Sequence, residues 1–362
     1  MKAQRLATLR AQLPTKLLDA VLVTHPSNRF YLSGYTADDA PPNESAGCLL
    51  IMPDAAYLIT SGTNENQARA QATDYTVVRR TGAVAEALLP LLNQHRVRRL
   101  GFEEDALVVS AYNSLMAAVT GDTELIAVGE LASELRLAKS SDELALIERA
   151  VAITDAAFEA VAATMRPDQT ERQVAWALED AMRRGGADGL GFPTIVAAGP
   201  NGAFAHHEPG DQLLGEGLPI TIDMGARVGG YHADLTRTVI LGEPTERSRE
   251  VYRTVLGALA AAEAGIRAGM TGKEADTLAR DVIAAAGYGD YFGHGLGHGV
   301  GVRVHEAPNA GPNFDTPLTI GATLTIEPGI YIPEWGGARI EDLVVIEATG
   351  VRVLSQAAKQ VV

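Results

Sequence analysis

The stretch TIDMGARVGGYHAD, residues 221–234, decides the fold of the second half of this chain. Apolar residues flank a glycine-rich centre on both sides, a pattern typical of a β-hairpin whose turn contains Gly229. Asp223 and Asp234 then lie symmetrically about the predicted centre of the hairpin, between Val228 and Gly229. The side chains of directly opposed strand residues point to the same face, with their Cβ atoms about 5 Å apart. The stretch therefore predicts two facing carboxylates, which repel each other unless a cation lies between them.

A second stretch, residues 323–347, repeats this arrangement. Glu327 and Glu341 are equidistant from Glu334, which lies in the predicted turn PEWGG, residues 333–337. All four acids have strongly apolar neighbours, and we therefore expect all four in strands. A single acid near a turn is usually a solvated surface residue, but two facing pairs in one domain indicate a functional set.

A glycine-rich segment with histidines, FGHGLGHGVG at residues 292–301, suggests how a cation is bound. Glycines let the backbone approach a site closely, and imidazole is a common metal ligand. One histidine with four carboxylates is a hard, oxygen-rich set that suits manganese, magnesium, cobalt or zinc and disfavours copper or iron–sulfur clusters. The four negative charges match two divalent cations, which carboxylates can bridge.

Composition and charge limit the partners of the chain. It has 362 residues, with 30 basic and 45 acidic side chains and a formal net charge of −15. Such an acidic protein is not attracted to nucleic acid or to anionic membrane surfaces, so we expect neither as a partner. No apolar run reaches the ~18 residues of a membrane span, and the start of the chain lacks the pattern of a secretory signal. The single cysteine, Cys48, excludes an intrachain disulfide, and we expect a cytoplasmic enzyme.

Charge and secondary-structure signals predict two domains, residues 1–133 and 134–362. The first carries 11 basic and 14 acidic side chains, and the second carries 19 and 31. In the first domain, short apolar segments alternate with helical stretches, which predicts an α/β fold with an acidic, proline-containing loop at Ala37–Glu44. The expected strands are 20–24, 48–52, 56–60 and 98–102, and the expected helices are 64–73 and 82–94.

The second domain has the pattern of an α+β fold, with helices on one face of a mostly antiparallel sheet. Its helices begin at capping boxes, in which a hydroxyl and a Glu or Gln three residues later bond free backbone amides. Such boxes stand at Ser140, Thr170 and Thr271, and a long alanine-rich helix is expected over residues 247–268. The expected strands are 218–224, 231–241, 323–332 and 339–347. This order indicates a duplicated unit of two helices and two strands.

Four segments resemble the signature blocks of the metallopeptidases with the pita-bread fold: IDMGARVGGYHADLTRT, HGLGHGVGVRVHEAP, TIEPGIY and RIEDLVVI. Within that family they are most similar to the proline-specific branch, Xaa-Pro dipeptidase (prolidase) and aminopeptidase P. The match runs from about Ser140 to Glu347. In the first domain, NRFYLSGYT at residues 28–36 resembles another family segment. The resemblance implies a pita-bread domain of duplicated ααββ units with a curved sheet, preceded by a smaller α/β domain of the creatinase/prolidase type.

The resemblance also implies the ligands of two divalent metal ions, with manganese as the first expectation and cobalt or zinc as alternatives. Asp223 would bind one metal, and His298 with Glu327 would bind the other. Asp234 and Glu341 would bridge the two ions.

Further roles follow from the same resemblance. His206 and His305 would face the substrate and stabilise the reaction intermediate, and His294 would line the pocket. Arg339 would orient an acidic ligand from behind. Glu327 would carry the proton of the attacking water to the leaving nitrogen.

Three features depart from the family pattern. His207 stands where a small residue is usual, and Arg303 stands where many relatives carry an acid. Ala37–Glu44 is an insertion near the expected active-site mouth, and such loops are where specificity usually varies. An acidic loop there would attract the free amino terminus of a substrate.

The predicted function is therefore a two-metal exopeptidase that hydrolyses short, proline-containing peptides, and the resemblance favours a homodimer formed partly through the first domain. One alternative is an exopeptidase of the same fold with a different specificity, such as a carboxypeptidase or a methionine aminopeptidase. The latter usually lacks the first domain. Creatinase-type hydrolases and non-catalytic, peptidase-like binding proteins are further alternatives. Both of these classes lose the metal ligands, whereas all five ligand positions are present here.

Overall fold

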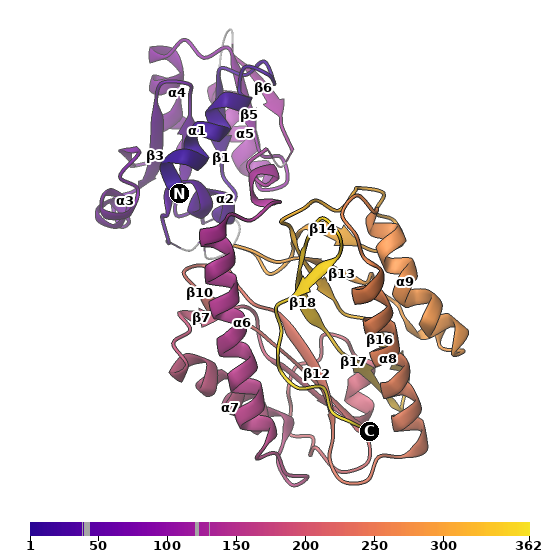
Figure 1. Ribbon diagram of the computed structural model, residues 1–362. Helices are drawn as coiled ribbons and strands as arrows, with labels where there is room; N and C mark the ends of the chain where they lie inside the picture. Colours follow the sequence, from indigo (N-terminus) through magenta and orange to yellow (C-terminus); the bar gives the residue numbers. More distant parts are fainter. Residues whose placement is uncertain (38, 40–43, 120–122, 130) are drawn as a thin grey trace. The chain divides into compact units, whose positions relative to one another are not determined.

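The computed structural model describes residues 1–37, 39, 44–119, 123–129 and 131–362. This part of the chain forms two compact units, Met1–Arg136 and Leu137–Val362 (Figure 1). No helix within the described ranges is both long and apolar enough to cross a membrane. Most of the loop predicted at Ala37–Glu44, namely residues 38 and 40–43, lies outside the description.

The first unit is an α/β domain, as predicted. Its six-stranded sheet has the order β4-β3-β2-β1-β5-β6, in which β2 is antiparallel to its neighbours and the other neighbouring pairs are parallel. The strands are β1 Ala20–Val23, β2 Cys48–Ile51, β3 Ala56–Ser61, β4 Thr76–Arg80, β5 Arg99–Phe102 and β6 Glu124–Ala127. The helices are α1 Lys2–Gln12, α2 Pro26–Ser33, α3 Glu65–Gln71, α4 Val84–Gln94 and α5 Val109–Ala118, and the short 3₁₀ helix η1 Glu134–Arg136 follows.

One acid of the predicted loop, Asp39, lies within the described residues and forms an ion pair. The carboxylate of Asp39 lies 2.9 Å from the buried guanidinium of Arg29 and accepts a hydrogen bond from the backbone N–H of Ala46. Arg29 also donates to the carbonyl oxygens of Ala37 and Gly47. Arg29 therefore contacts the chain at the start of the predicted loop and just after its end, and it is also the ion-pair partner of Asp39.

The helices of the second unit begin where the capping boxes predict. All three boxes are formed, at Ser140, Thr170 and Thr271, and Thr245 caps the remaining long helix. The helices are α6 Ser141–Ala162, α7 Glu171–Arg184, α8 Glu246–Gly265 and α9 Gly272–Ala285, with the 3₁₀ helices η2 Gly199–Ala203 and η3 Gly289–Tyr291.

The strands of the second unit form several small antiparallel sheets. Their orders are β12-β9-β8, β15-β18-β19, β11-β10-β7, β13-β14 and β16-β17. The strands in the first half are β7 Gly189–Leu190, β8 Ile195–Ala198, β9 Pro219–Met224, β10 Ala226–Val228, β11 Tyr231–His232 and β12 Leu235–Ile240. Those in the second half are β13 Gly297–Gly299, β14 Glu306–Ala310, β15 Thr323–Ile326, β16 Gly329–Ile332, β17 Gly336–Arg339, β18 Asp342–Ile346 and β19 Val351–Val353.

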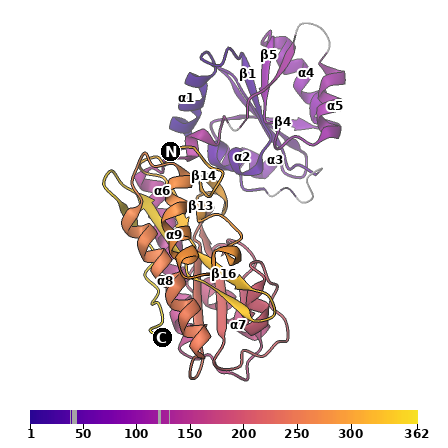
Figure 2. The ribbon, with the colours of Figure 1, turned by 90° about the vertical axis from the view of Figure 1, so that its right-hand side faces the viewer.

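Helices cover one face of these strands, which confirms the predicted α+β fold. Figure 2 shows α6 and α8 on the same side of the strands. Val255 and Leu259 of α8 and Ala279 of α9 are buried in one cluster with Leu324 of β15 and Val344 of β18. Burial of these apolar side chains is the main force that holds the helices on the sheet.

The first hairpin departs from the predicted register. Asp223 pairs with Thr236, and the turn is centred between Gly229 and Gly230, one residue later than predicted. Both glycines have positive φ, 58° and 81°, as in the turn type that matches the twist of a two-residue hairpin. The prediction that Asp234 lies directly opposite Asp223 is therefore wrong by two residues, although both remain on one face because the side-chain period of a strand is two.

The second hairpin has its turn at the predicted centre. Gly329 pairs with Arg339 and Ile332 pairs with Gly336, so that the ladder is centred on Glu334. Glu334 has a φ of 63° and so occupies the left-handed conformation that the turn requires.

The prediction that all four acids lie within strands is correct for Asp223 alone. Asp234, Glu327 and Glu341 lie in breaks between consecutive strands. For two of them the physical reason is that their own backbone bonds outside the hairpin ladder: the backbone N–H of Glu327 donates to the carbonyl oxygen of Leu296, and that of Glu341 donates to the carbonyl oxygen of Thr236.

Candidate metal centre

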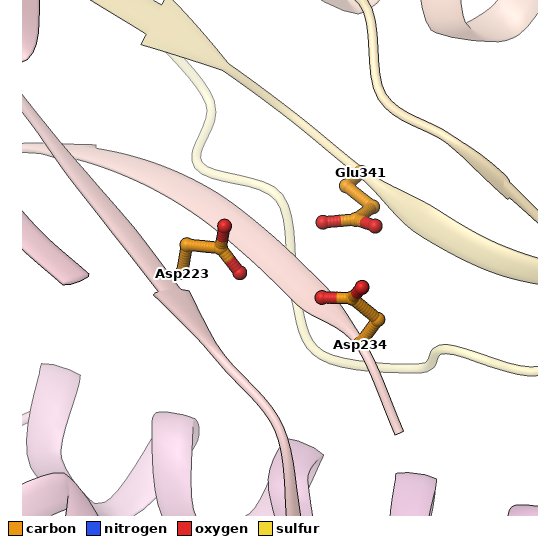
Figure 3. Close-up of side chains that lie close together, drawn as sticks. All are labelled: Asp223, Asp234 and Glu341. Atoms are coloured by element: carbon orange, nitrogen blue, oxygen red, sulfur yellow. The ribbon is translucent and has the colours of Figure 1, made fainter. Parts of the chain in front are cut away.

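Three acids from separate strand ends meet in the second unit. Asp223 comes from β9, Asp234 follows β11 and Glu341 precedes β18, and their carboxyl groups point toward one another (Figure 3). One oxygen of each lies within 4.8 Å of the others. Among the described residues, Oδ1 of Asp223 and Oε1 of Glu341 are buried and have no hydrogen-bond partner. Buried oxygens without partners, so close together, are the arrangement that a bound cation would satisfy.

The pKa shifts of these acids also favour a bound cation. Burial raises the pKa of Asp234 well above its ordinary value, and the neighbouring charges of Glu341 and Asp223 raise it further. Burial and the charges of Glu327 and Asp223 likewise raise the pKa of Glu341 well above its usual range. The cluster therefore holds more negative charge than its own surroundings compensate, which fits a site for divalent metal.

His298 and Glu327 lie beside the three acids. Nε2 of His298 is 3.2 Å from Oε1 of Glu327 and 3.8 Å from Oδ2 of Asp234. Burial by itself would raise the pKa of Glu327, but the hydrogen bond and charge of His298 outweigh it and lower that pKa to about 2. All five residues predicted as ligands line one cavity of about 580 Å³.

A glycine brings His298 into this cavity. A Cβ at residue 297 would collide with the carbonyl oxygen of Thr325, so only glycine lets β13 approach β15 this closely. The hydroxyl of Thr325 then accepts a hydrogen bond from the backbone N–H of His298 at 2.9 Å and donates to Glu327 at 3.0 Å.

The three histidines predicted to face the substrate also line the cavity. The ring of His305 lies edge-on to that of His298, with centroids 4.2 Å apart. Burial and the charge of His298 lower the pKa of His305, which favours its neutral form. Nε2 of His294 is 2.8 Å from the hydroxyl of Tyr331, and burial lowers the pKa of His294. His206 is exposed at the cavity.

The two departures from the family pattern occupy different places. His207 lines the cavity. Arg303 lies outside the set of residues that form the cavity wall, and its backbone N–H donates to Glu306.

Arg339 lies behind the acids and joins four groups. Its guanidinium is buried and donates to Oδ2 of Asp223 at 2.7 Å, to the hydroxyl of Thr236 at 3.0 Å and to the hydroxyl of Tyr331 at 2.8 Å. It also donates to the carbonyl oxygen of Ala205, 3.3 Å away. Such a planar fork can hold an acidic ligand in one orientation.

Three of these contacting residues were missed in the sequence: Thr236, Thr325 and Tyr331. The hydroxyl of Thr236 donates to Oε2 of Glu341 at 2.7 Å. A threonine in an apolar strand gives no signal of this contact, because threonine is common in strands for other reasons. Tyr331 is the last residue of the segment TIEPGIY and could have been predicted as a site residue from its place in that segment.

We expect Arg339→Lys to reduce kcat/KM by about ten- to hundredfold, the usual effect when a metal ligand, here the predicted ligand Asp223, loses an outer partner. Lysine cannot contact Asp223, Thr236 and Tyr331 at once, because it lacks the planar fork. Steady-state kinetics on the metal-loaded protein measure the effect. Arg352→Lys, which alters an exposed ion pair with Glu148, is the matched control. Wild-type kcat/KM in Arg339→Lys would contradict this role.

Comparison with known proteins finds relatives that match along the whole chain. An uncharacterized peptidase of Bacillus subtilis, YqhT, is 40% identical over 362 residues, which are 100% of this chain and 99% of that protein. The structure of an Xaa-Pro dipeptidase from Bacillus anthracis matches with a TM-score of 0.93 and 36% identity, over 100% of this chain and 99% of that chain. The structure of an X-Pro aminopeptidase from Thermotoga maritima matches with a TM-score of 0.91 and 32% identity, over 98% of both chains.

Two family models divide the chain between them. Residues 5–138 match the creatinase/prolidase N-terminal domain, and residues 145–348 match metallopeptidase family M24. The chain therefore belongs to metallopeptidase family M24 and carries the creatinase/prolidase N-terminal domain in front of its peptidase domain.

Proposed function

We propose that this metallopeptidase is an exopeptidase that hydrolyses the bond next to proline in short peptides, as an Xaa-Pro dipeptidase or an Xaa-Pro aminopeptidase. The observation that carries the proposal is one cavity in which three clustered carboxylates, two of them with a buried oxygen that lacks a hydrogen-bond partner, meet His298, Glu327 and further histidines. The names of the matched structures, an Xaa-Pro dipeptidase and an X-Pro aminopeptidase, support the specificity.

The proposed cofactors are two divalent metal ions, manganese first, held by Asp223, Asp234, His298, Glu327 and Glu341. Bound ions of this kind supply Lewis-acid polarisation and a water molecule that ionises near neutral pH. The mixed set of one imidazole and four carboxylates suits manganese, cobalt or zinc.

In this proposal, the chain's own groups carry the proton and stabilise the developing charge. Glu327 is ionised at neutral pH, because its pKa is low. We give it the role that the family resemblance implies, which is to pass the proton of the attacking water to the leaving nitrogen. His305 is neutral and can donate a hydrogen bond to the oxyanion, a role that we also give to His206. His294 would contact the bound peptide.

Apolar side chains in the wall of the cavity support a proline-containing substrate. Phe192, Ile195, Val304 and Phe314 are among its lining residues. The peptide nitrogen of proline carries no hydrogen, so a proline pocket requires apolar walls and no acceptor for that nitrogen. The apolar side chains of the cavity therefore support specificity for proline.

To test the function, a chelator first removes bound metal from the protein. The protein is then reloaded with manganese, cobalt or zinc, and its metal content is measured. We expect two ions per chain and cleavage of Ala-Pro or Ala-Pro-Ala, with little action on a Met-Ala peptide or creatine. The ratio of kcat/KM for Ala-Pro and Ala-Pro-Ala separates a dipeptidase from an aminopeptidase. Preference for Met-Ala, or a protein that binds no metal, would refute the proposal.

We further propose that the protein is a cytoplasmic homodimer, and that residues 1–133 contribute dimer contacts and control substrate access. The family resemblance supports this assignment. Sedimentation of the whole chain and of the separate domain 134–362 would measure both the oligomeric state and the contribution of the first domain.

A further inference from the structure

Glu171, the first residue of α7, is completely buried and has no part in the metal cluster. Its two carboxylate oxygens accept four hydrogen bonds, which is the full capacity of the ionised group. Oε1 accepts from the backbone N–H of Ala198 at 2.8 Å and from the side-chain amide of Asn201 at 2.9 Å. Oε2 contacts Nε2 of His207 at 2.8 Å and accepts from the backbone N–H of Gly210 at 3.0 Å.

These four partners are spread along one segment, residues 198–210, which carries His206. The backbone at the start of α7 also binds this segment, because the backbone N–H of Arg172 donates to the carbonyl oxygen of Gly210. Position 202 in the same segment packs against β17 so closely that a Cβ there would lie 2.9 Å from the backbone nitrogen of Gly337. His206 thus lies between the anchors at Asn201 and His207 and is itself exposed to the cavity.

The contact with His207 has a defined direction. A carboxylate that accepts three other hydrogen bonds has no proton to offer, so Nε2 of His207 carries the hydrogen. A carboxylate that accepts from an imidazole in this way holds the ring in one orientation and one tautomer. The start of α7 also stabilises the charge of Glu171, because a helix N-terminus carries partial positive charge.

From these contacts we propose that Glu171 and His207 form a clamp that positions His206 in the substrate cavity. Both are positioning residues, since they act on the reaction through His206. The clamp rests on the proposed function for its effect on catalysis, while its effect on the segment 198–210 is independent of any substrate.

The central test replaces Glu171 by Gln, which keeps the shape but turns an NH₂ group toward two of the donors. The matched control is Glu143→Gln, another buried glutamate in the first turn of a helix, which accepts from Ser140 and Tyr231. We expect Glu171→Gln to lower kcat by about ten- to hundredfold with a nearly unchanged KM and metal content, and Glu143→Gln to leave kcat nearly unchanged.

A double-mutant cycle shows whether the effect passes through His206. In a His206→Ala background, Glu171→Gln should cause less than about a twofold further loss, because coupled residues are not additive. An equal loss in both backgrounds would overturn the proposal, as would full activity in Glu171→Gln. Should Glu171→Gln fail to fold, the cycle is run with the half-buried His207: His207→Ala should lose activity as described, and His207→Gln, which restores an N–H donor, should recover most of it.

Hydrogen–deuterium exchange on metal-free protein tests the clamp without any activity. We expect Glu171→Gln to speed exchange within residues 198–210 and to leave the exchange of α6 and α9 unchanged, whereas Glu143→Gln should leave residues 198–210 protected. Unchanged exchange in this segment would overturn the clamp even if the enzyme hydrolyses Xaa-Pro peptides. Conversely, faster exchange without such hydrolysis would support the clamp and refute the proposed function alone.

Discussion

Asp234→Asn and Glu341→Gln are each expected to abolish peptidase activity, with a loss in kcat/KM of about a thousandfold or more. Each change removes one negative charge from a buried cluster whose ligand oxygens lie within 4.8 Å of one another. Metal ions contribute several kcal/mol of charge stabilisation to such reactions, and about 4 kcal/mol corresponds to a thousandfold in rate. Steady-state kinetics and metal analysis of the purified variants measure the loss.

The control for this experiment is Glu347→Gln. Glu347 lies six residues after Glu341 and is exposed, where it pairs with Arg352. The same chemical change at this position should leave both activity and metal content as in the wild type. If Asp234→Asn or Glu341→Gln retained near-normal turnover and two bound metals, the assignment of these acids as ligands would be wrong.

Metal loading is expected to raise the melting temperature of the protein strongly. A ligand that binds the folded state alone at about a thousandfold above its Kd stabilises that state by about 4 kcal/mol. For a unit of 226 residues, Leu137–Val362, this corresponds to a shift of roughly 8–16 °C. Thermal melts after chelation, with and without added manganese, measure the shift. Identical midpoints would mean that the carboxylates do not form a metal site.

The metal-free protein should also show an effect of pH that identifies the acids. Because the pKa of Asp234 is raised in the folded state, this group binds more protons folded than unfolded. Its contribution to stability is therefore most favourable at low pH and is lost as the pH rises through the folded pKa. Asn mimics the protonated acid, so metal-free Asp234→Asn should melt above the metal-free wild type, by a margin that increases from pH 6 to pH 8.

Paired melts of the two metal-free proteins across this range measure the contribution of Asp234 together with its effect on the neighbouring charges of Glu341 and Asp223. Glu327 does not titrate in this window, because its pKa is lowered to about 2. A variant that melts below the wild type throughout would show that Asp234 stabilises the fold by a direct contact.

Local signals in the sequence were sufficient for many elements. A capping box is formed within four residues, and the starts of α6, α7 and α9 were therefore predictable at Ser140, Thr170 and Thr271. Several elements of the first unit, such as β4 with its polar TVVRR sequence and α5, gave weaker signals and were not predicted. Their stability depends on the neighbours against which they pack, which a short window of sequence does not contain.

The sequence by itself determined the kind of site: the number of acids, the histidine in a glycine-rich segment, and the turn at Glu334. Only the tertiary structure decided how these groups meet. A turn one residue later than expected places Thr236, and not Asp234, opposite Asp223. Glu171, which lies 52 residues before Asp223 in the sequence, gains its partners only when residues 198–210 fold against the start of α7. The physical reason is that residue spacing specifies period and turn, whereas register, strand breaks and contacts between distant segments depend on packing across the whole unit.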